Sequence, residues 1–285
     1  MSKQVQKVEV RRELKKQIKI KGQNVAYLDF GHTDDPVVLL IHGVPESSML
    51  WKEIIPAIVS EGYRTIAPDL PGFGQSERFN ETSSWERYEQ FVTDFLNELE
   101  LDQVHIVLHD WGGLIGLRWA SSNTERVNSL IITDTTFTPD YTWHKAAQIW
   151  QTPGKGEELI KQMSNKELWF AGMEKEVPGV CVDVLEDFFQ IFSSDDTRSV
   201  ILELYRSGDM KKVIPYQGKL KQINKPVTII WGEKDPYVST DYAYKLRDQE
   251  FPHAKVHIIP DAGHFIHIEV PEATQTFVKE HFNKI

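Results

Sequence analysis

The stretch that decides the fold is Val104-His105-Ile106-Val107-Leu108-His109-Asp110-Trp111-Gly112-Gly113. Its first five residues are mostly apolar and β-branched, which predicts a buried strand. Two glycines come directly after Trp111, and the apolar run Leu114–Ala120 then predicts a helix. A strand, one exposed side chain, then glycine and a helix form a sharp turn that presents that side chain as a nucleophile. The residue at the tip of this turn is Asp110, where a serine is common.

An aspartate at this position changes the chemistry that the turn predicts. A carboxylate displaces a leaving group from carbon without first losing a proton, and the product is an ester between the aspartate and the alkyl group. Carbon–halogen bonds and epoxides are therefore more suitable substrates than esters or amides. The competing interpretation is structural, because an aspartate that follows a strand often caps a helix.

Length and composition indicate a globular protein of one large α/β domain with room for an insertion. The chain has 285 residues, of which 40% are hydrophobic and 11% aromatic, and its formal net charge is −10. This acidic balance disfavours nucleic acid and anionic membranes as partners. Cys181 is the single cysteine, so no intrachain disulfide is expected and a reducing compartment is favoured. No apolar run approaches the roughly 18 residues of a membrane span, and we therefore expect a cytoplasmic protein.

Strand-like and helical patterns alternate along most of the chain. A charged arm opens it, and strands are predicted over Glu13–Ile20, Asn24–Phe30, Pro36–Ile41, Thr65–Asp69, Val104–Leu108, Val127–Thr133, Pro226–Trp231 and Lys255–Ile259. Helices are predicted over Met49–Ser60, Trp85–Glu100, Leu114–Ser122 and Glu272–Phe282. This alternation predicts an α/β fold with a mostly parallel, doubly wound sheet. The pattern stops over residues 135–220, where helical segments predict a cap inserted between two parts of a core, 1–134 and 221–285.

Three side chains with suitable chemistry lie just after predicted strands. They are Asp110, Asp235 and His264, and their order along the chain is nucleophile, acid, histidine. Because open α/β sheets bind ligands at the carboxyl ends of their strands, we expect the three to meet. His264 would activate water to hydrolyse the ester, and Asp235 would orient it. Asp134, which follows another strand, is an alternative acid.

A second turn is expected to complete the site. His42-Gly43-Val44-Pro45 follows a strand, so the backbone N–H of Val44 can point toward Asp110, together with the N–H of Trp111. His109 is expected to point away from the site because neighbouring residues on a strand alternate faces. The remaining histidines show no metal-ligand spacing, and no metal is predicted.

These motifs resemble the haloalkane dehalogenases and the related epoxide hydrolases. The resemblance is carried by His109–Gly113, His42–Trp51, Ala67–Ser76 and Asp261–Phe265. It implies an α/β-hydrolase fold with a helical cap, catalysis without a cofactor, and a small apolar organic substrate that reacts with water. It does not indicate an oligomeric state. A third hypothesis, a non-catalytic ligand receptor of the same fold, leaves the retained acid unexplained.

In such dehalogenases two donors hold the departing halide, and the indole of Trp111 matches the first. Where one branch has an asparagine as the second donor, this chain has Val44; another branch uses a tryptophan of the cap. The resemblance therefore implies a cap tryptophan here, for which Trp150 and Trp169 are our prediction. The alternative activity depends on Tyr205, in Leu204-Tyr205-Arg206, which resembles an epoxide hydrolase motif whose tyrosine polarises the epoxide oxygen.

Overall fold

The computed structural model describes residues 8–285, and an eight-stranded sheet lies at its centre. The part of the predicted charged arm that falls on residues 1–7 is outside the described residues. The strand order is β1-β2-β4-β3-β5-β6-β7-β8, and all pairs are parallel except those made by β2. The strands are β1 (Lys16–Ile20), β2 (Gln23–Phe30), β3 (Val37–Ile41), β4 (Arg64–Pro68), β5 (Val104–His109), β6 (Val127–Thr133), β7 (Val227–Gly232) and β8 (Lys255–Ile259).

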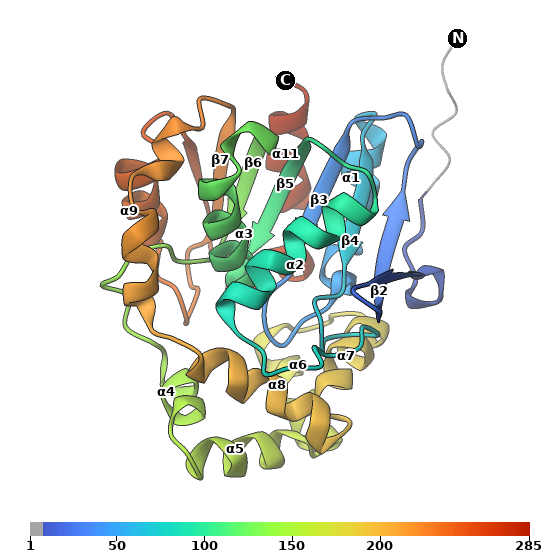
Figure 1. Ribbon diagram of the computed structural model, residues 1–285, viewed down its shortest axis with the longest axis vertical. Coiled ribbons are helices and arrows are strands. Elements are labelled where there is room, and N and C mark those ends of the chain that lie inside the picture. The colour runs from blue at the N-terminus through green and yellow to red at the C-terminus, as the bar shows by residue number, and fades with distance from the viewer. Residues whose placement is uncertain (1–7) are drawn as a thin grey trace.

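Helices cover both faces of this sheet, which explains why its central strands are apolar along their whole length. Every residue of β3, β5 and β7 is buried. Figure 1 shows α2 (Trp85–Glu98) and α3 (Asp110–Ser122) in front of the sheet and α11 (Pro271–Phe282) behind it. The short helix α1 (Ile55–Ser60) packs against α11. The predicted doubly wound, mostly parallel fold is confirmed.

Several elements differ from the sequence-based expectation at their ends or in their existence, and three of them have a clear physical reason. The expected helix over residues 49–60 is split into a 3₁₀ turn, Ser48–Trp51, and α1, because Pro56 favours the first turn of a new helix. The expected first strand begins only at Lys16, since Arg12–Leu14 forms a 3₁₀ turn. Helix α9 (Thr240–Glu250) was not predicted, because it buries only three of its residues.

Between β6 and β7 the chain forms five helices, called here the α4–α8 segment. They are α4 (Lys145–Gln151), α5 (Lys155–Met163), α6 (Lys166–Glu176), α7 (Val182–Phe189) and α8 (Asp195–Arg206). Figure 1 shows them gathered at one end of the sheet. The described part of the segment contains no strand, and the boundaries predicted for a separate cap, 135 and 220, stay a prediction. Within residues 8–285, no helix has both the length and the apolar character needed to cross a membrane.

Candidate active site

The turn between β5 and α3 holds Asp110 in a strained backbone conformation. Its φ angle is 48°, a region that side-chain-bearing residues seldom adopt. The surroundings of the turn admit no extra atoms: a Cβ on Gly112 would lie 2.2 Å from the carbonyl oxygen of Ile41, and one on Gly43 would lie 2.3 Å from Asp110 Oδ1. The glycines of the motif therefore allow strand, helix and neighbouring loop to approach closely and leave the Asp110 carboxylate at the sheet's carboxyl end.

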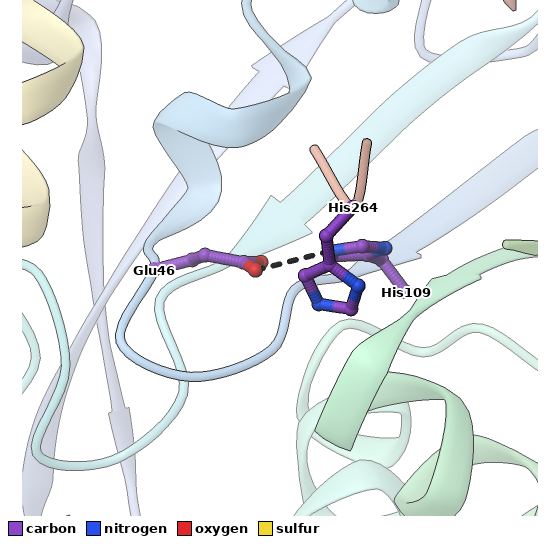
Figure 2. A group of neighbouring side chains, drawn as sticks. All are labelled: Glu46, His109 and His264. Carbon is purple, nitrogen blue, oxygen red and sulfur yellow. Dashed lines mark ion pairs between the residues drawn. The ribbon is translucent and has the colours of Figure 1, made fainter. Parts of the chain in front are cut away.

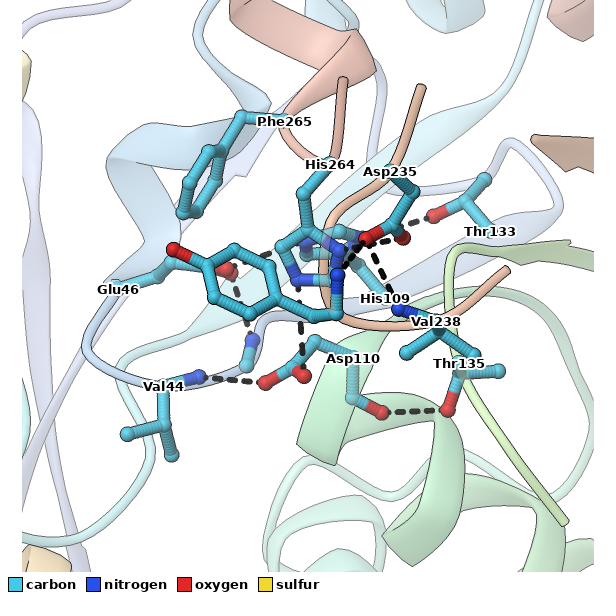
Figure 3. Close-up of polar contacts among 12 residues, drawn as sticks. Val44, Glu46, His109, Asp110, Thr133, Thr135, Asp235, Val238, His264 and Phe265 are labelled. Atoms are coloured by element: carbon cyan, nitrogen blue, oxygen red, sulfur yellow. Dashed lines mark hydrogen bonds and ion pairs between the residues drawn. The ribbon is translucent and has the colours of Figure 1, made fainter. Parts of the chain in front are cut away.

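Asp110, His264 and Asp235 form a connected set (Figure 3). His264 Nδ1 lies 2.8 Å from Asp235 Oδ2, and His264 Nε2 lies 3.6 Å from Asp110 Oδ2. The other oxygen of Asp235 accepts hydrogen bonds from the backbone N–H groups of Tyr237 (2.7 Å) and Val238 (2.9 Å). A carboxylate so placed can only accept from His264, so it fixes the proton on Nδ1 and directs Nε2 toward Asp110. The three residues predicted from the sequence thus meet.

Charge at this site is shared between two carboxylates and one imidazole. Burial opposes the ionised form of Asp110, but His264 and the N–H of Val44 outweigh it and hold the carboxyl pKa below its usual value. Burial likewise opposes the charged form of His264, yet the two aspartates keep its pKa well above the usual value. Both shifts favour an ionised nucleophile beside a protonated histidine.

Asp134, the alternative acid, lies at the end of β6 but makes a different contact. Its Oδ1 accepts from the backbone N–H of Gly232 at 2.9 Å, and its Oδ2 is buried without a hydrogen-bond partner among the described residues. Burial and the nearby Asp235 carboxylate raise its pKa well above the usual value, so a neutral carboxylic acid is favoured. A carboxyl group that is bonded to Gly232 and makes no hydrogen bond to His264 is poorly placed to orient that histidine.

The turn at Val44 lies where the sequence placed it. Its backbone N–H donates to Asp110 Oδ1 at 2.9 Å, and Figure 3 shows the two side by side. The ring of Trp111 is buried, stacks on Trp143 with centroids 5.5 Å apart, and meets the Tyr205 ring edge-on at 4.9 Å. One oxygen of the nucleophile is therefore held by a backbone donor, and aromatic rings cover the side of the site next to it.

A buried glutamate and a second histidine support the site from behind. Glu46 Oε2 accepts from the Gly43 N–H at 2.7 Å, and Glu46 Oε1 lies 3.1 Å from His109 Nε2, off line for a hydrogen bond (Figure 2). The His109 ring lies against His264, with centroids 4.6 Å apart. The expectation that His109 points away from the site was wrong, because strand alternation ends where β5 turns into the helix.

Glu46, His109 and His264 also bring three potential metal-ligand atoms within 4.8 Å of one another. The donor set does not suit a metal, however. Nδ1 of His264 is bonded to Asp235 and its Nε2 faces Asp110, so binding an ion would take His264 away from one of its carboxylates. The imidazole of His264 instead lies between the His109 ring and the carboxylates of Asp110 and Asp235.

A cavity of about 180 Å³ opens above Asp110 and His264, and the α4–α8 segment supplies much of its wall. Trp150 and Trp169, the predicted cap tryptophans, both line it, as does Tyr205. Trp150 Nε1 is buried without a hydrogen-bond partner among the described residues, whereas the Trp169 ring packs against Phe189 and other aromatic rings. The two cap tryptophans thus share one space with the nucleophile, whereas Trp111 lines a smaller pocket beside it, together with Asp110, Trp143 and Tyr205.

Three polar lining residues were missed by sequence reasoning, besides several aliphatic ones. His144 caps helix α4 by accepting from the Ala147 N–H, Tyr237 follows the acid on its loop, and Glu176 ends α6. No motif marks them. Only the position of Tyr237, two residues after Asp235, could have indicated that it lies near the site.

The fold and this geometry agree with a family comparison. The chain matches the model of the alpha/beta hydrolase fold family over residues 36–152 and 165–271, and it belongs to that family. Part of it is 40% identical to a haloalkane dehalogenase of Psychrobacter cryohalolentis, over 104 residues that make up 36% of this chain and 34% of that relative. It is also 40% identical over 121 residues to a haloalkane dehalogenase of Sphingobium indicum, 41% of this chain and 40% of the relative. The matches thus span about a third to two fifths of these curated relatives.

Solved structures of similar shape come from both enzyme classes. A haloalkane dehalogenase from Bradyrhizobium elkani superposes with a TM-score of 0.82 and 23% identity, covering 95% of this chain and 97% of that one. An epoxide hydrolase from Vigna radiata superposes with a TM-score of 0.79 and 22% identity, covering 95% and 98%. At these identities the structural similarity shows the fold alone, and the activity has to be inferred from the geometry of the site.

Proposed function

We propose that this protein is a hydrolase that forms an alkyl ester on Asp110, and that it acts as a haloalkane dehalogenase that releases halide and alcohol. The observation that carries the proposal is the Asp110 carboxylate at the sharp turn, with His264 on one side and the Val44 N–H on the other. The partial identity to haloalkane dehalogenases supports the same activity.

In the first step, Asp110 Oδ2 attacks the carbon that bears the leaving group. A C–O bond forms, the carbon–halogen bond breaks, and the halide departs with the electron pair. Asp110 Oδ1, which accepts a hydrogen bond from the Val44 N–H, becomes the carbonyl oxygen of the ester. The low pKa of Asp110 keeps the attacking group ionised.

In the second step, water attacks the carbonyl carbon of the ester and His264 Nε2 takes its proton. The Val44 N–H then faces the oxyanion, with the Trp111 N–H as the expected second donor. Collapse of this intermediate expels the alkoxide, which takes the proton back from His264 and leaves as the alcohol. Asp110 is left as a carboxylic acid, and transfer of its remaining proton to His264 restores the carboxylate. Because the ester has no charge, one of the groups that raise the His264 pKa is lost once Asp110 is alkylated, which favours the neutral base. Ester hydrolysis should accordingly accelerate as pH rises through the His264 pKa of the alkyl enzyme.

The halide site is proposed to be made by Trp111 with Trp150 and Trp169. An epoxide hydrolase that gives diols is the second candidate, and Tyr205 favours it. Its ring is buried beside Trp111, and burial followed by the Asp110 charge raises its pKa well above the usual value, so the hydroxyl stays protonated. Such a hydroxyl could donate a proton to an epoxide oxygen.

The remaining expectations are part of the same proposal. The α4–α8 segment would act as the cap, the substrate would be a small organic molecule with water as co-substrate, and no cofactor would be needed. The single cysteine, Cys181, supports a reducing compartment such as the cytoplasm.

A panel of brominated alkanes and epoxides, scored for halide release and for diol formation, tests this function. Halide release by the wild type and none by Asp110→Asn is the expected result. Diol without halide would replace the dehalogenase by the epoxide hydrolase.

The covalent step has its own measurement. His264→Gln should stop after the first step, so mass spectrometry of the intact protein after incubation with a bromoalkane should show one added alkyl group. Peptide mapping should place it on Asp110, and Asp110→Asn is the control that must stay unmodified. A wild type that turns over while His264→Gln never carries the alkyl group would contradict the covalent mechanism.

A further inference from the structure

The cavity above Asp110 contains one carboxylate that the proposed mechanism does not use. Most of its wall is aromatic or aliphatic, but Glu176, the last residue of α6, is among the lining residues. A carboxylate is expensive to place beside an apolar cavity unless it has a partner. Its presence there therefore points to something that the cavity is built to hold.

Glu176 is held in place without being neutralised. The Tyr237 hydroxyl donates to Glu176 Oε1, and the backbone N–H of Tyr237 is in turn bonded to Asp235. Within residues 8–285, no lysine or arginine pairs with Glu176, and its Oε2 makes no hydrogen bond. One oxygen is thus fixed to the loop of the catalytic acid, while the other remains available to a ligand.

The rest of the site adds to this negative charge. The carboxylates of Asp110 and Asp235 face a single imidazole, that of His264. These three residues together therefore carry no net positive charge that could balance the charge of Glu176. No lysine or arginine lines the cavity. In a partly desolvated space the resulting field favours a cation next to Glu176.

The aromatic rings of the cavity suit the same kind of ligand. Trp150, Trp169, Tyr205 and Tyr237 line it, and the Trp150 and Tyr205 rings are in contact, with centroids 4.9 Å apart. Ring faces attract organic cations, and a quaternary ammonium group loses little hydration when it enters such a site. A carboxylate next to several rings is the usual environment for an ammonium group in proteins.

We infer that the cavity selects a substrate that carries an organic ammonium group close to the carbon that Asp110 attacks, with Glu176 as its counter-ion. The inference rests on the proposed function, which supplies the reacting carbon. The positive charge of the substrate is inferred from the residues that line the cavity. With a volume of about 180 Å³, the cavity exceeds the roughly 150 Å³ that can hold a benzene molecule, so a small ammonium compound fits. Halogenated acids, which are anions, would be excluded.

Binding of an unreactive pair of ligands tests the charge preference without any turnover. Choline and its uncharged analogue 3,3-dimethylbutan-1-ol have nearly the same shape, and binding to the wild type can be followed by calorimetry. We expect choline to bind at least about tenfold more tightly, which corresponds to about 1.4 kcal/mol. Equal affinities, or tighter binding of the alcohol, would overturn the inference.

Glu176→Gln removes the charge while its amide oxygen can still accept from Tyr237. In this variant choline and 3,3-dimethylbutan-1-ol should bind with nearly equal affinity. Glu167→Gln makes the same charge change on an exposed residue of the same helix and should leave the preference intact. A preference that survives Glu176→Gln in a folded protein would overturn the assignment. If circular dichroism shows that this variant does not fold, the wild-type ratio decides alone.

A reactive pair connects the inference to catalysis. The wild type should show a higher kcat/KM for (2-bromoethyl)trimethylammonium than for 1-bromo-3,3-dimethylbutane, and Glu176→Gln should lower that ratio about tenfold. If neither bromide is hydrolysed, the proposed function fails, while the choline titration still reports on Glu176. If both are hydrolysed at a ratio that Glu176→Gln leaves unchanged, only the inference fails.

Discussion

The sheet and the α4–α8 segment position their side chains in different ways. Asp110, Asp235 and His264 follow strands, and backbone geometry places them: a positive φ at Asp110 and two backbone donors at Asp235. Trp150 and Glu176, in contrast, lie on helices that are held by packing and a few polar contacts. We therefore expect the sheet to determine the type of reaction, and the helices above it to determine the leaving group and the substrate.

Both apolar packing and buried ion pairs join the two regions. Lys15, which precedes β1, is completely buried between Asp69 of the core and Asp187 of α7, and the Ser47 hydroxyl also donates to Asp187. The α4–α8 segment leaves Leu168 (68% exposed) at its surface, while β3, β5 and β7 expose no residue. We expect substitutions in the sheet to affect the chemistry and substitutions in the segment to affect selectivity.

The largest expected effect lies in the sheet, at the acid. Asp235→Asn should lower kcat about 10⁴-fold, because an amide cannot hold His264 in the tautomer and charge state that ester hydrolysis needs. Asp134→Asn should cost much less than a hundredfold, since Asp134 makes no bond to His264 and its raised pKa already favours a neutral side chain. Steady-state halide release at neutral pH measures both.

These two variants also decide between the alternative acids. An Asp134→Asn protein that loses activity as completely as Asp235→Asn would transfer the orienting role to Asp134. Thermal unfolding of both variants should accompany the kinetics, because Asp134 accepts from the Gly232 N–H and its replacement could alter stability.

The second prediction concerns the junction between the two regions. Lys15→Met should reduce the free energy of unfolding by about 3–5 kcal/mol, because it leaves Asp69 buried without its counter-ion and Asp187 with Arg12 alone, 3.6 Å away. Burial alone would raise the Asp69 pKa, but Lys15 and backbone donors hold it below the usual value. That stabilisation is present above the unfolded-state pKa of about 3.9 and is lost as pH falls through the lower folded-state pKa, so the difference between variant and wild type should narrow in acid.

Urea unfolding measures this effect, and Lys16→Met is the matched control. Lys16 contacts Asp29 at 2.8 Å, but its side chain is 55% exposed, so its loss should cost less than about 1 kcal/mol. Adding Asp187→Asn to Lys15→Met should restore part of the loss, because it removes one of the two buried carboxylates that lost Lys15 as a partner. Equal effects of the two lysine substitutions would show that the buried cluster does not hold the regions together.

The sheet and the α4–α8 segment also differ in how much of them could be predicted from the sequence. Continuous apolar runs fixed the strands, and residues directly after them, such as Asp110 and His264, could be expected to meet because parallel strands end at one edge. Helix α9 escaped prediction because its buried stripe is short, and the role of His109 escaped it because strand alternation fails at the turn. Glu176 could not be found at all, since its position depends on how a helix packs over the sheet.

The third prediction separates the two tryptophans of the cavity. Trp150→Phe keeps an aromatic ring but removes an indole N–H that is buried without a partner, so it should lower kcat/KM for chloroalkanes about tenfold, or about 1.4 kcal/mol. Trp169→Phe should cost less, because that ring packs among other aromatic rings. Bromide quenching of tryptophan fluorescence provides an independent reading. Equal losses in both variants would mean that packing, and not the Trp150 N–H, is responsible.

The smallest expected effect is a gain in stability at Gly172, inside helix α6. A Cβ there would meet no atom within 4 Å, and glycine costs a helix about 0.5–1 kcal/mol relative to alanine. Gly172→Ala should therefore stabilise the protein by up to that amount in urea unfolding and leave kcat unchanged. Gly43→Ala, in the sheet region, is the contrasting variant, because its methyl group would collide with Asp110 and displace the nucleophile. A loss of stability in Gly172→Ala would contradict this prediction.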